Sequence, residues 1–311
     1  MSHEVITTAT GAHAMRDLTT GEVMHPGVGP LVESERLYVT PSRLVQRLAA
    51  PGADPLVVLD AGLGAGSNAV AAWRAAETAE AHGVCADARA PTLTSDSEQR
   101  DPGGLAALPA GTPKLAHASA GLGRGLEIVS VDRTLAALEL AISPEHAAAF
   151  GFDAPAVEAA RRLLRDGSTA GVRTRWRVRV GDLLAELALE PADSVDVVFW
   201  DPYSPRASPA IWNLTAFSAL RRVCRAGATV HTYSAATSTR TALLLAGFAV
   251  GYGAAVSSKQ RHTTVAALDA RDLTKPLDRS WLLQLTEAAR CWPSDAPPDA
   301  LAQLQAHPQF Q

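Results

Sequence analysis

Cysteine is scarce in this chain: Cys85, Cys224 and Cys291 are the only three in 311 residues. They are odd in number and widely spaced, with no nearby histidine or cysteine ligands, so we expect free thiols in a reducing compartment and no metal site. Long apolar runs are also lacking. No stretch approaches the roughly 20 apolar residues of a membrane span, and residues 1–14 have no apolar signal-peptide core. We therefore expect a cytoplasmic protein.

Aromatic residues make up only 5% of the chain, whereas alanine inflates a hydrophobic content of 47%. This composition predicts a globular protein with helices rich in alanine and leucine. The length suits one large α/β domain, with or without an added subdomain. The net charge of −4 gives no general attraction to a polyanion, so an RNA partner would have to meet a local basic patch.

Strand and helix patterns alternate along most of the chain. The apolar run 56–60 predicts a strand covered on both faces, and glycines and an alanine-rich helix at 68–79 follow it. We expect further strands at 126–132, 176–180, 194–200 and 228–233, a closing pair at 250–255 and 263–268, and helices at 41–49, 133–141, 155–165, 216–223 and 239–246. This order predicts an α/β fold with a mostly parallel, doubly wound sheet and an antiparallel closing strand.

Three further regions flank or interrupt this pattern. Residues 1–50 form a lead segment that we expect to pack on the catalytic domain at 51–268, with 19–31 as loop rather than regular structure. Residues 87–125 are rich in proline and glycine, which predicts a surface insertion. Residues 269–311 predict a helix at 281–289 and a peripheral polar tail.

Acidic residues follow three successive predicted strands: Asp60, Asp132 and Asp182. The carboxyl ends of strands are where open α/β sheets bind ligands, so together they favour adenosine, with Asp132 at the ribose hydroxyls and Asp182 at the adenine amino group. The alternative is a purely structural role, in which Asp132 and Asp182 only cap helices. Gly62, Gly64 and Gly66 bring a ligand close to the backbone, although an ordinary turn could carry the same glycines.

The fourth predicted strand ends in Asp201-Pro202-Tyr203-Ser204-Pro205, and Pro209 and Trp212 follow. Three prolines make a rigid, non-helical loop, from which Asp201, Tyr203 and Trp212 can project beside a cofactor. Trp212 could equally start a helix and pack.

Other polar residues are open to two interpretations. Tyr233 ends the fifth predicted parallel strand and could line a substrate pocket, whereas His231 is better explained as a core histidine. Lys259 and Arg261 form a basic patch between the closing strands. The arginines at positions 173, 175, 177 and 179 alternate along one strand face, as on an exposed edge protected by charge.

In order and spacing, several of these motifs resemble the methyltransferase domain of the MnmC/MnmD-type enzymes, which act on the wobble uridine of tRNA. The similarity covers roughly residues 19–268 and is carried by the lead segment 21–34, the loop 62–68, the stretch 201–212, and 232–234 followed by Arg240, Leu244, Gly247 and Phe248. The chain departs from the family in its glycine loop, which lacks the usual bulky residue and threonine, in Asp132, where Glu is frequent, and in the insertion.

The resemblance implies a Rossmann-like class I methyltransferase that uses S-adenosylmethionine and modifies tRNA. The predicted cofactor residues are Glu33, Asp60, Gly62, Gly64, Gly66, Asn68, Asp132, Asp182 and Asp201. The predicted catalytic residues are Asp201, Tyr203 and Trp212, and the predicted substrate residues are Pro202, Ser204, Tyr233, Lys259 and Arg261. Because no flavin-binding oxidase pattern follows residue 268, we expect a separate oxidase partner for the preceding step.

A sulfonium methyl group is already activated, so its transfer needs mainly alignment, and neither a metal nor a covalent nucleophile. If the acceptor is an amine, Asp201 could hold it and stabilise the cation that develops. Three alternatives stay open: a small-molecule amine as acceptor, a spermidine-synthase-like aminopropyltransferase, and a catalytically silent module that binds RNA or protein.

Overall fold

The computed structural model describes residues 2–25, 27–83, 123–255, 262–286 and 288–311. Nearly all of the insertion expected at 87–125 lies outside these residues, as do Cys85, Lys259 and Arg261. The larger sheet of the described part has eight strands, in the order β10-β11-β9-β8-β4-β5-β7-β6. They are β4 (Leu56–Ala61), β5 (Leu126–Asp132), β6 (Ser168–Ala170), β7 (Thr174–Val180), β8 (Val195–Trp200), β9 (Cys224–Thr232), β10 (Ala249–Ala255) and β11 (His262–Ala267).

The sheet has a parallel centre and antiparallel margins. Strands β7, β5, β4, β8 and β9 are parallel, β11 is antiparallel to both β9 and β10, and β6 is antiparallel to β7. The predicted α/β fold with an antiparallel closing strand is therefore confirmed. The short strand β6 was not expected, and because it pairs with β7, the arginine-bearing strand β7 is not the exposed edge considered above.

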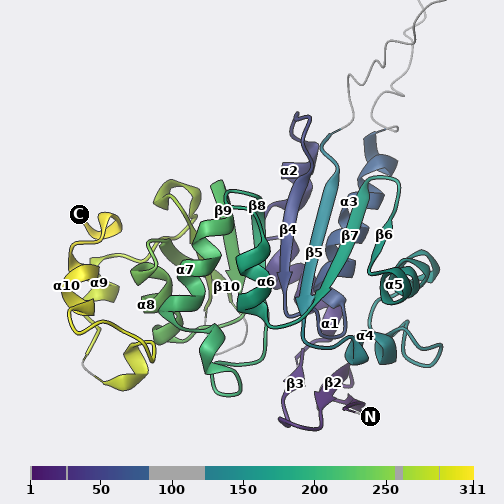
Figure 1. Cartoon of the computed structure of the whole chain (residues 1–311), viewed down its shortest axis with the longest axis horizontal. Coiled ribbons are helices and arrows are strands. Elements are labelled where there is room, and N and C mark those ends of the chain that lie inside the picture. Colours follow the sequence, from purple (N-terminus) through teal and green to yellow (C-terminus); the bar gives the residue numbers. More distant parts are fainter. Residues whose placement is uncertain (1, 26, 84–122, 256–261, 287) are drawn as a thin grey trace, which may run out of the picture.

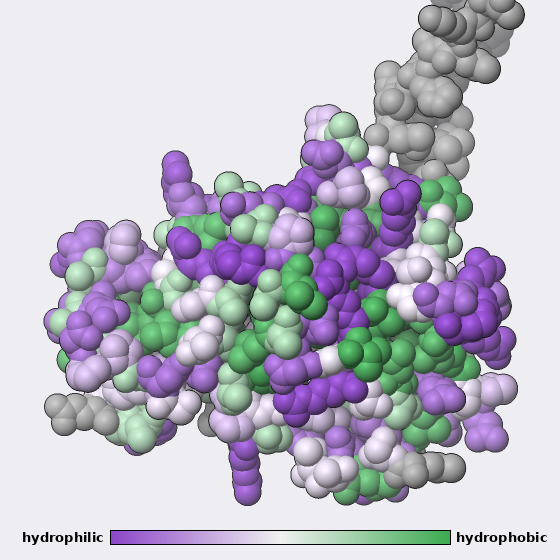
Figure 2. Space-filling view, in the orientation of Figure 1, coloured by the Kyte–Doolittle hydropathy of each residue, from purple (hydrophilic) through white to green (hydrophobic). Residues whose placement is uncertain are grey.

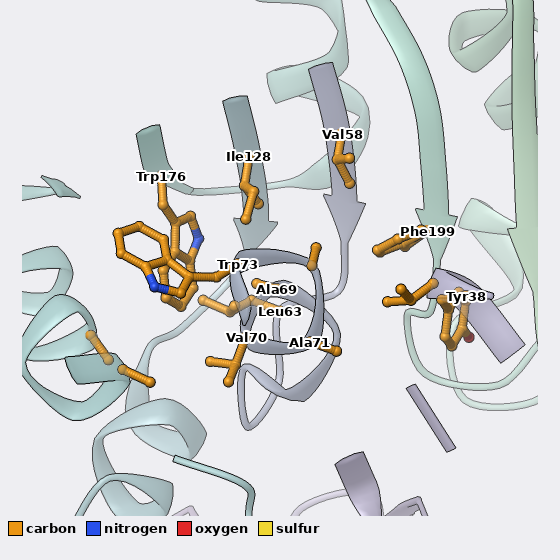
Figure 3. Close-up of a cluster of buried hydrophobic side chains, with 14 of the residues drawn as sticks. Tyr38, Val58, Leu63, Ala69, Val70, Ala71, Trp73, Ile128, Trp176 and Phe199 are labelled. Atoms are coloured by element: carbon orange, nitrogen blue, oxygen red, sulfur yellow. The ribbon is translucent and has the colours of Figure 1, made fainter. Parts of the chain in front are cut away.

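Helices cover both faces of this sheet (Figure 1). They are α2 (Leu44–Ala49), α3 (Ser67–Gly83), α4 (Ala136–Ala141), α5 (Ala154–Asp166), α6 (Leu183–Leu189), α7 (Leu214–Val223) and α8 (Thr237–Leu245). Successive strand residues point to opposite faces, so Val58 packs with α3 and α5 in one core, while Leu59 packs with α6, α7 and α8 in the other. Figure 3 shows part of the first core, where Trp73 of α3 stands beside Trp176 of β7.

The lead segment contains regular structure that the sequence analysis missed. Within the described residues, β1 (His3–Thr7), β2 (His13–Asp17) and β3 (Val23–Met24) form an antiparallel sheet, and α1 (Pro30–Ser34) and the π-helical turn η1 (Glu35–Val39) follow. The expectation of a loop at 19–31 was wrong for β3 and α1. These elements are short, and contacts with distant parts of the chain hold them. Figure 1 shows this sheet below the carboxyl ends of β4 and β5.

The C-terminal segment also differs from its prediction. Helix α9 covers only Arg279–Leu282, and two 3₁₀ turns, η4 (Ala289–Cys291) and η5 (Pro308–Phe310), and α10 (Ala300–Gln305) follow; a further turn, η3, covers Ala270–Asp272. The helix expected at 281–289 ends early because the chain turns back, and the Cys291 carbonyl accepts a hydrogen bond from Thr241 of α8. The tail is not peripheral, since Leu304 and Phe310 are buried in the core beside α8.

Candidate active site

A cavity of about 1020 Å³ lies at the carboxyl ends of β4, β5 and β8, between the large sheet and the N-terminal sheet. Ligand pockets usually span about 300–1000 Å³, so this one lies at the upper end of that range. Both sheets contribute to its wall, and the large sheet supplies the loops that follow its strands. This is the place where open α/β sheets bind their ligands.

The floor of the cavity is the glycine turn between β4 and α3. Gly62 and Gly64 line the cavity, with φ angles of 89° and 51° that side chains rarely tolerate. A Cβ atom on Gly62 would stand 2.7 Å from the Cα of Pro202, so only glycine lets the loop after β8 lie directly on this turn. The predicted cofactor loop, which is this turn, is therefore in direct contact with the predicted acceptor loop after β8.

Asp132 is the acidic strand-end residue that lines the cavity. Its carboxylate accepts a hydrogen bond of 2.8 Å from the Gly64 amide and a longer one of 3.4 Å from the Thr134 amide. Burial raises the pKa of Asp132, although these amides oppose the shift. The carboxylate is thus fixed at the tip of β5 beside the glycine turn.

Asp201 is a cavity carboxylate with a side-chain hydrogen-bond donor on each oxygen. Tyr38 of η1 donates a 2.6 Å hydrogen bond to its Oδ1, and the Asn68 side-chain amide donates a 2.7 Å bond to its Oδ2. The Tyr38 ring rests against Phe199, the penultimate residue of β8 (Figure 3). Burial raises the pKa of Asp201, and His25, Tyr38 and Asn68 counteract that rise.

His25 lies next to Asp201 and was not predicted as a site residue. Its Nε2 is 3.7 Å from Asp201 Oδ2, and its Nδ1 is 3.5 Å from Glu33 Oε2. The other oxygen of Glu33 accepts hydrogen bonds from the amides of Gly27 and Val28, at 2.7 and 3.1 Å. Glu33, predicted as a cofactor residue, is therefore tied mainly to this turn and to His25.

Hydrogen bonds connect the N-terminal sheet and its turn to the tip of the loop after β8. The Tyr203 hydroxyl donates a 2.6 Å hydrogen bond to Asp17, and His3 Nε2 lies 3.2 Å from the same hydroxyl. The Ser204 amide and hydroxyl both donate to the carboxylate of Glu22. Tyr203 and Ser204 are therefore hydrogen-bonded to residues of the lead segment, which precedes every strand of the large sheet.

Several predicted site residues are not part of the cavity wall. Asp182 caps α6 through the amides of Leu184 and Ala185 and pairs with Arg133 at 2.9 Å. Trp212 is buried and donates to the Tyr203 carbonyl. The rest of this group are Asp60, Gly66 and Asn68, of which Asn68 reaches the site only through Asp201.

The remaining predicted residues fall into two groups. Pro202 and Tyr233 line the cavity, and the Tyr233 hydroxyl donates to the Pro202 carbonyl. Lys259 and Arg261 lie outside the described residues, so their predicted role has no structural account.

The arginines of β7 and the core histidine have local explanations. Arg177 pairs with Glu127 and Glu190, and Arg179 pairs with Glu190. Figure 2 shows hydrophilic residues on the surface of the molecule in the region of β7. His231 is buried, and burial lowers its pKa to about 3, so it is a neutral core residue as expected.

The sequence analysis missed the contribution of the lead segment to the site. Asp17, Glu22, His25 and Tyr38 all contact the loop after β8, although 160 or more residues of chain separate them from it. The available signal was the lead segment 21–34, which carried part of the family resemblance. A residue such as Tyr38, in a short apolar run, gave no sign that its hydroxyl meets a carboxylate.

Two features are absent from the described residues. No group of three or more His, Cys, Asp or Glu side chains there could hold a metal ion. No helix in that part of the chain is both long and apolar enough to cross a membrane.

Comparison with known proteins shows which proteins this chain is similar to. A family model described as "S-adenosyl-L-methionine-dependent methyltransferase" matches residues 157–269. This match covers 113 of the 311 residues. The chain is also 27% identical, over 84% of its length, to the tRNA 5-methylaminomethyl-2-thiouridine biosynthesis bifunctional protein MnmC of Methylibium petroleiphilum, and 28% identical over 74% to that of Ectopseudomonas mendocina.

These matches confirm the resemblance stated above, and they also limit it. The chain spans about a third of the length of those curated relatives, 34% and 30%. The crystal structure of MnmC2 from Aquifex aeolicus covers 98% of this chain, and the chain covers 85% of that protein, with a TM-score of 0.66 and 22% identity. That likeness shows the fold.

The residues of the cavity fit the cofactor of this methyltransferase family. Asp132 presents carboxylate oxygens of the kind that would accept hydrogen bonds from ribose hydroxyls, and Met24, Leu63 and Leu183 add apolar wall. The Oδ1 of Asn68 is buried and has no hydrogen-bond partner among the described residues, so the polar group beside Asp201 keeps an unused acceptor.

Proposed function

We propose that this chain transfers a methyl group from S-adenosylmethionine to the aminomethyl nitrogen of the modified wobble uridine in tRNA. The observation that carries the proposal is the Asp201 carboxylate, which lines the cavity while Tyr38 and Asn68 hold its two oxygens. The MnmC relatives are named for tRNA 5-methylaminomethyl-2-thiouridine biosynthesis, which supports tRNA as the acceptor. A tRNA substrate would place the protein in the cytoplasm, and the separate oxidase partner stays a prediction.

The proposed site divides between two ligands. Asp132, Gly62 and Gly64 would hold the adenosyl part of the cofactor, which supplies a methyl group activated by its sulfonium. Asp201, Tyr233 and the loop after β8 face the remaining volume, where the acceptor would lie. Arg36 and Arg133 also line the cavity and are exposed, so they offer cations to a phosphate backbone despite the net charge of −4.

Asp201 has a defined task in this arrangement. A primary amine must be neutral to attack, and it would become a cation as the new N–C bond forms, while the S–C bond of the sulfonium breaks and leaves a neutral thioether. A carboxylate oxygen that accepts an N–H of the amine orients its lone pair and stabilises the developing charge. Tyr38 and Asn68 prevent rotation of the carboxylate, so the acceptor meets a fixed hydrogen-bond partner.

Replacement of Asp201 by Asn tests this role. Asp201→Asn keeps an acceptor for the Tyr38 hydroxyl but removes the charge, so we expect turnover to fall by about 10²-fold or more with little change in cofactor affinity. Single-turnover rates and calorimetric titration with S-adenosylmethionine measure the two effects. Asp166→Asn, an exposed carboxylate beside Arg165, is the matched control. Full turnover in Asp201→Asn would refute the role.

The acceptor is tested directly with RNA. We expect transfer of labelled methyl groups to total tRNA from a bacterial strain that lacks the final methylation, and nucleoside analysis should find the label in 5-methylaminomethyl-2-thiouridine. Fully modified tRNA is the control, because its acceptor nitrogen is already methylated. Label in another nucleoside, or in small amines alone, would show that the acceptor is wrong.

A further inference from the structure

His25 stands between two carboxylates in a way that the proposed transfer does not itself require. Nδ1 lies 3.5 Å from Glu33 Oε2 and Nε2 lies 3.7 Å from Asp201 Oδ2, and the side chain is only 12% exposed. Both ring nitrogens therefore face anionic groups, in a part of the cavity wall where little water reaches them.

The backbone of this segment is built to keep His25 there. Its φ angle is 53°, a conformation that is uncommon outside glycine and that Asn, Asp and His adopt more often than other residues. Glu33 accepts hydrogen bonds from the Gly27 and Val28 amides, which fixes the turn after His25. The same carboxylate thus shapes the turn and faces the imidazole.

The geometry favours one protonation state of the ring. A neutral imidazole has one N–H group and one lone pair, so it would point the lone pair at either Glu33 or Asp201. An imidazolium donates toward both. Burial alone would lower the pKa of His25, but the facing carboxylates outweigh that effect, and the pKa is raised above its ordinary value.

The groups around His25 are nearly all acidic. Glu33 from α1 and Asp201 from the loop after β8 face its two nitrogens, and Asp60 from β4 adds a more distant carboxyl group. Tyr38 from η1 reaches Asp201 but not the imidazole. An imidazolium is thus the positive charge that balances this acidic cluster.

We propose that His25 is held as an imidazolium between Glu33 and Asp201, and that as a positioning residue it keeps the Asp201 carboxylate ionised for the acceptor amine. This inference rests on the proposed function, in which Asp201 binds that amine. Without the cation, burial of Asp201 would favour its protonated form, which has no negative charge to stabilise the developing cation and carries an O–H donor at one oxygen. Glu33 serves the same end indirectly, because it stabilises the cation.

The charge of His25 can be measured without any acceptor. In the protein with ¹⁵N-labelled histidine, NMR should show a His25 imidazolium at neutral pH, with a pKa above the ordinary 6.5. Glu33→Gln keeps an acceptor for the Gly27 and Val28 amides but removes the charge, so the pKa of His25 should fall by about one unit. Glu35→Gln is the control, since that carboxyl group faces Arg74. A neutral His25 at neutral pH would overturn the proposal.

The effect on Asp201 appears in the pH dependence of kcat/KM. His25→Asn removes the cation and suits the positive φ angle, because Asn tolerates that conformation better than most residues. The pKa of Asp201 should rise, so the acid limb should move to higher pH by about one unit, while the rates converge with wild type at alkaline pH. Glu33→Gln should give a smaller shift in the same direction, and Glu35→Gln none.

The outcomes separate the two proposals. If no tRNA or amine is methylated, the proposed function fails, while the NMR titration still decides the state of His25. If methylation occurs but the acid limb of both variants stays in place, or their rates fall equally at every pH, His25 has only a structural role and the inference is wrong.

Discussion

Asp60 is an acid in a place that strongly disfavours a charge. It is fully buried within β4, its Oδ2 accepts a 2.7 Å hydrogen bond from Ser130, and its Oδ1 has no partner among the described residues. Burial raises its pKa to about 8, and the nearby Asp201 and Asp132 add to the shift. At neutral pH the folded protein therefore holds mostly a neutral Asp60, whereas the unfolded chain has released that proton.

This buried acid should make stability depend on pH. Between the unfolded pKa of 3.8 and about 8, the folded state keeps a proton that the unfolded state loses. The free energy of unfolding should fall in that window by up to about 1.4 kcal/mol per pH unit, whereas Asp60 contributes no slope below or above it. In Asp60→Asn this slope should disappear. Urea unfolding across the window measures it, with Asp166→Asn as the control, and curves parallel to wild type in Asp60→Asn would contradict the assignment.

Single residues also show where prediction from sequence stops. Asp60, Asp132 and Asp182 were predicted as one set because each follows or ends a strand, and all three do lie at that edge of the sheet. Only Asp132 of these three lines the cavity. Asp60 is buried in the core. The oxygens of Asp182 accept hydrogen bonds from a backbone amide of α6 and from the Arg133 side chain. Strand patterns predict the edge, but the direction of a side chain depends on partners far away in sequence.

Among the elements, the N-terminal sheet is the one whose attachment can be tested. Tyr203→Phe removes the hydroxyl that donates to Asp17 and meets His3. We expect the free energy of unfolding to fall by about 1–2 kcal/mol and amide exchange to quicken in residues 3–24. Tyr252→Phe is the control, because the Tyr252 ring packs against Arg240 at the other side of the sheet. Unchanged exchange in residues 3–24 would show that other contacts hold this sheet.

The same element explains the unequal success of prediction. Strand β5 occupies the predicted residues 126–132, because Leu126, Ile128, Val129 and Val131 give this segment the apolar, β-branched character of a buried parallel strand. Strands β1 and β2 have five residues each and mix His, Glu, Arg and Asp with apolar residues. Their position depends on contacts such as that between Tyr203 and Asp17, 186 residues apart, and no local pattern contains that information.

At the scale of the whole molecule, the C-terminal tail belongs to the methyltransferase core. Phe310 stacks on Trp281, with ring centroids 6.4 Å apart, and both pack into the core that contains α7 and α8. Gln309 acts as a substitute strand, since its side chain exchanges hydrogen bonds with the Val250 amide and carbonyl at the edge of β10. The polar composition of the tail concealed these few anchoring residues.

Loss of this anchor should weaken the entire domain. Phe310 is 3% exposed, so Phe310→Ala should lower the free energy of unfolding by about 3–5 kcal/mol, through lost burial and the cavity left beside Trp281. Leu283→Ala, at a side chain that is 84% exposed, is the matched control and should change stability little. Because Phe310 does not line the active-site cavity, cofactor affinity well below the melting temperature should be unchanged. Urea unfolding combined with amide exchange tests this prediction. A single transition, shifted to lower urea concentration, means that the tail is part of the core. Amide exchange that quickens only in residues 300–311 would contradict the prediction.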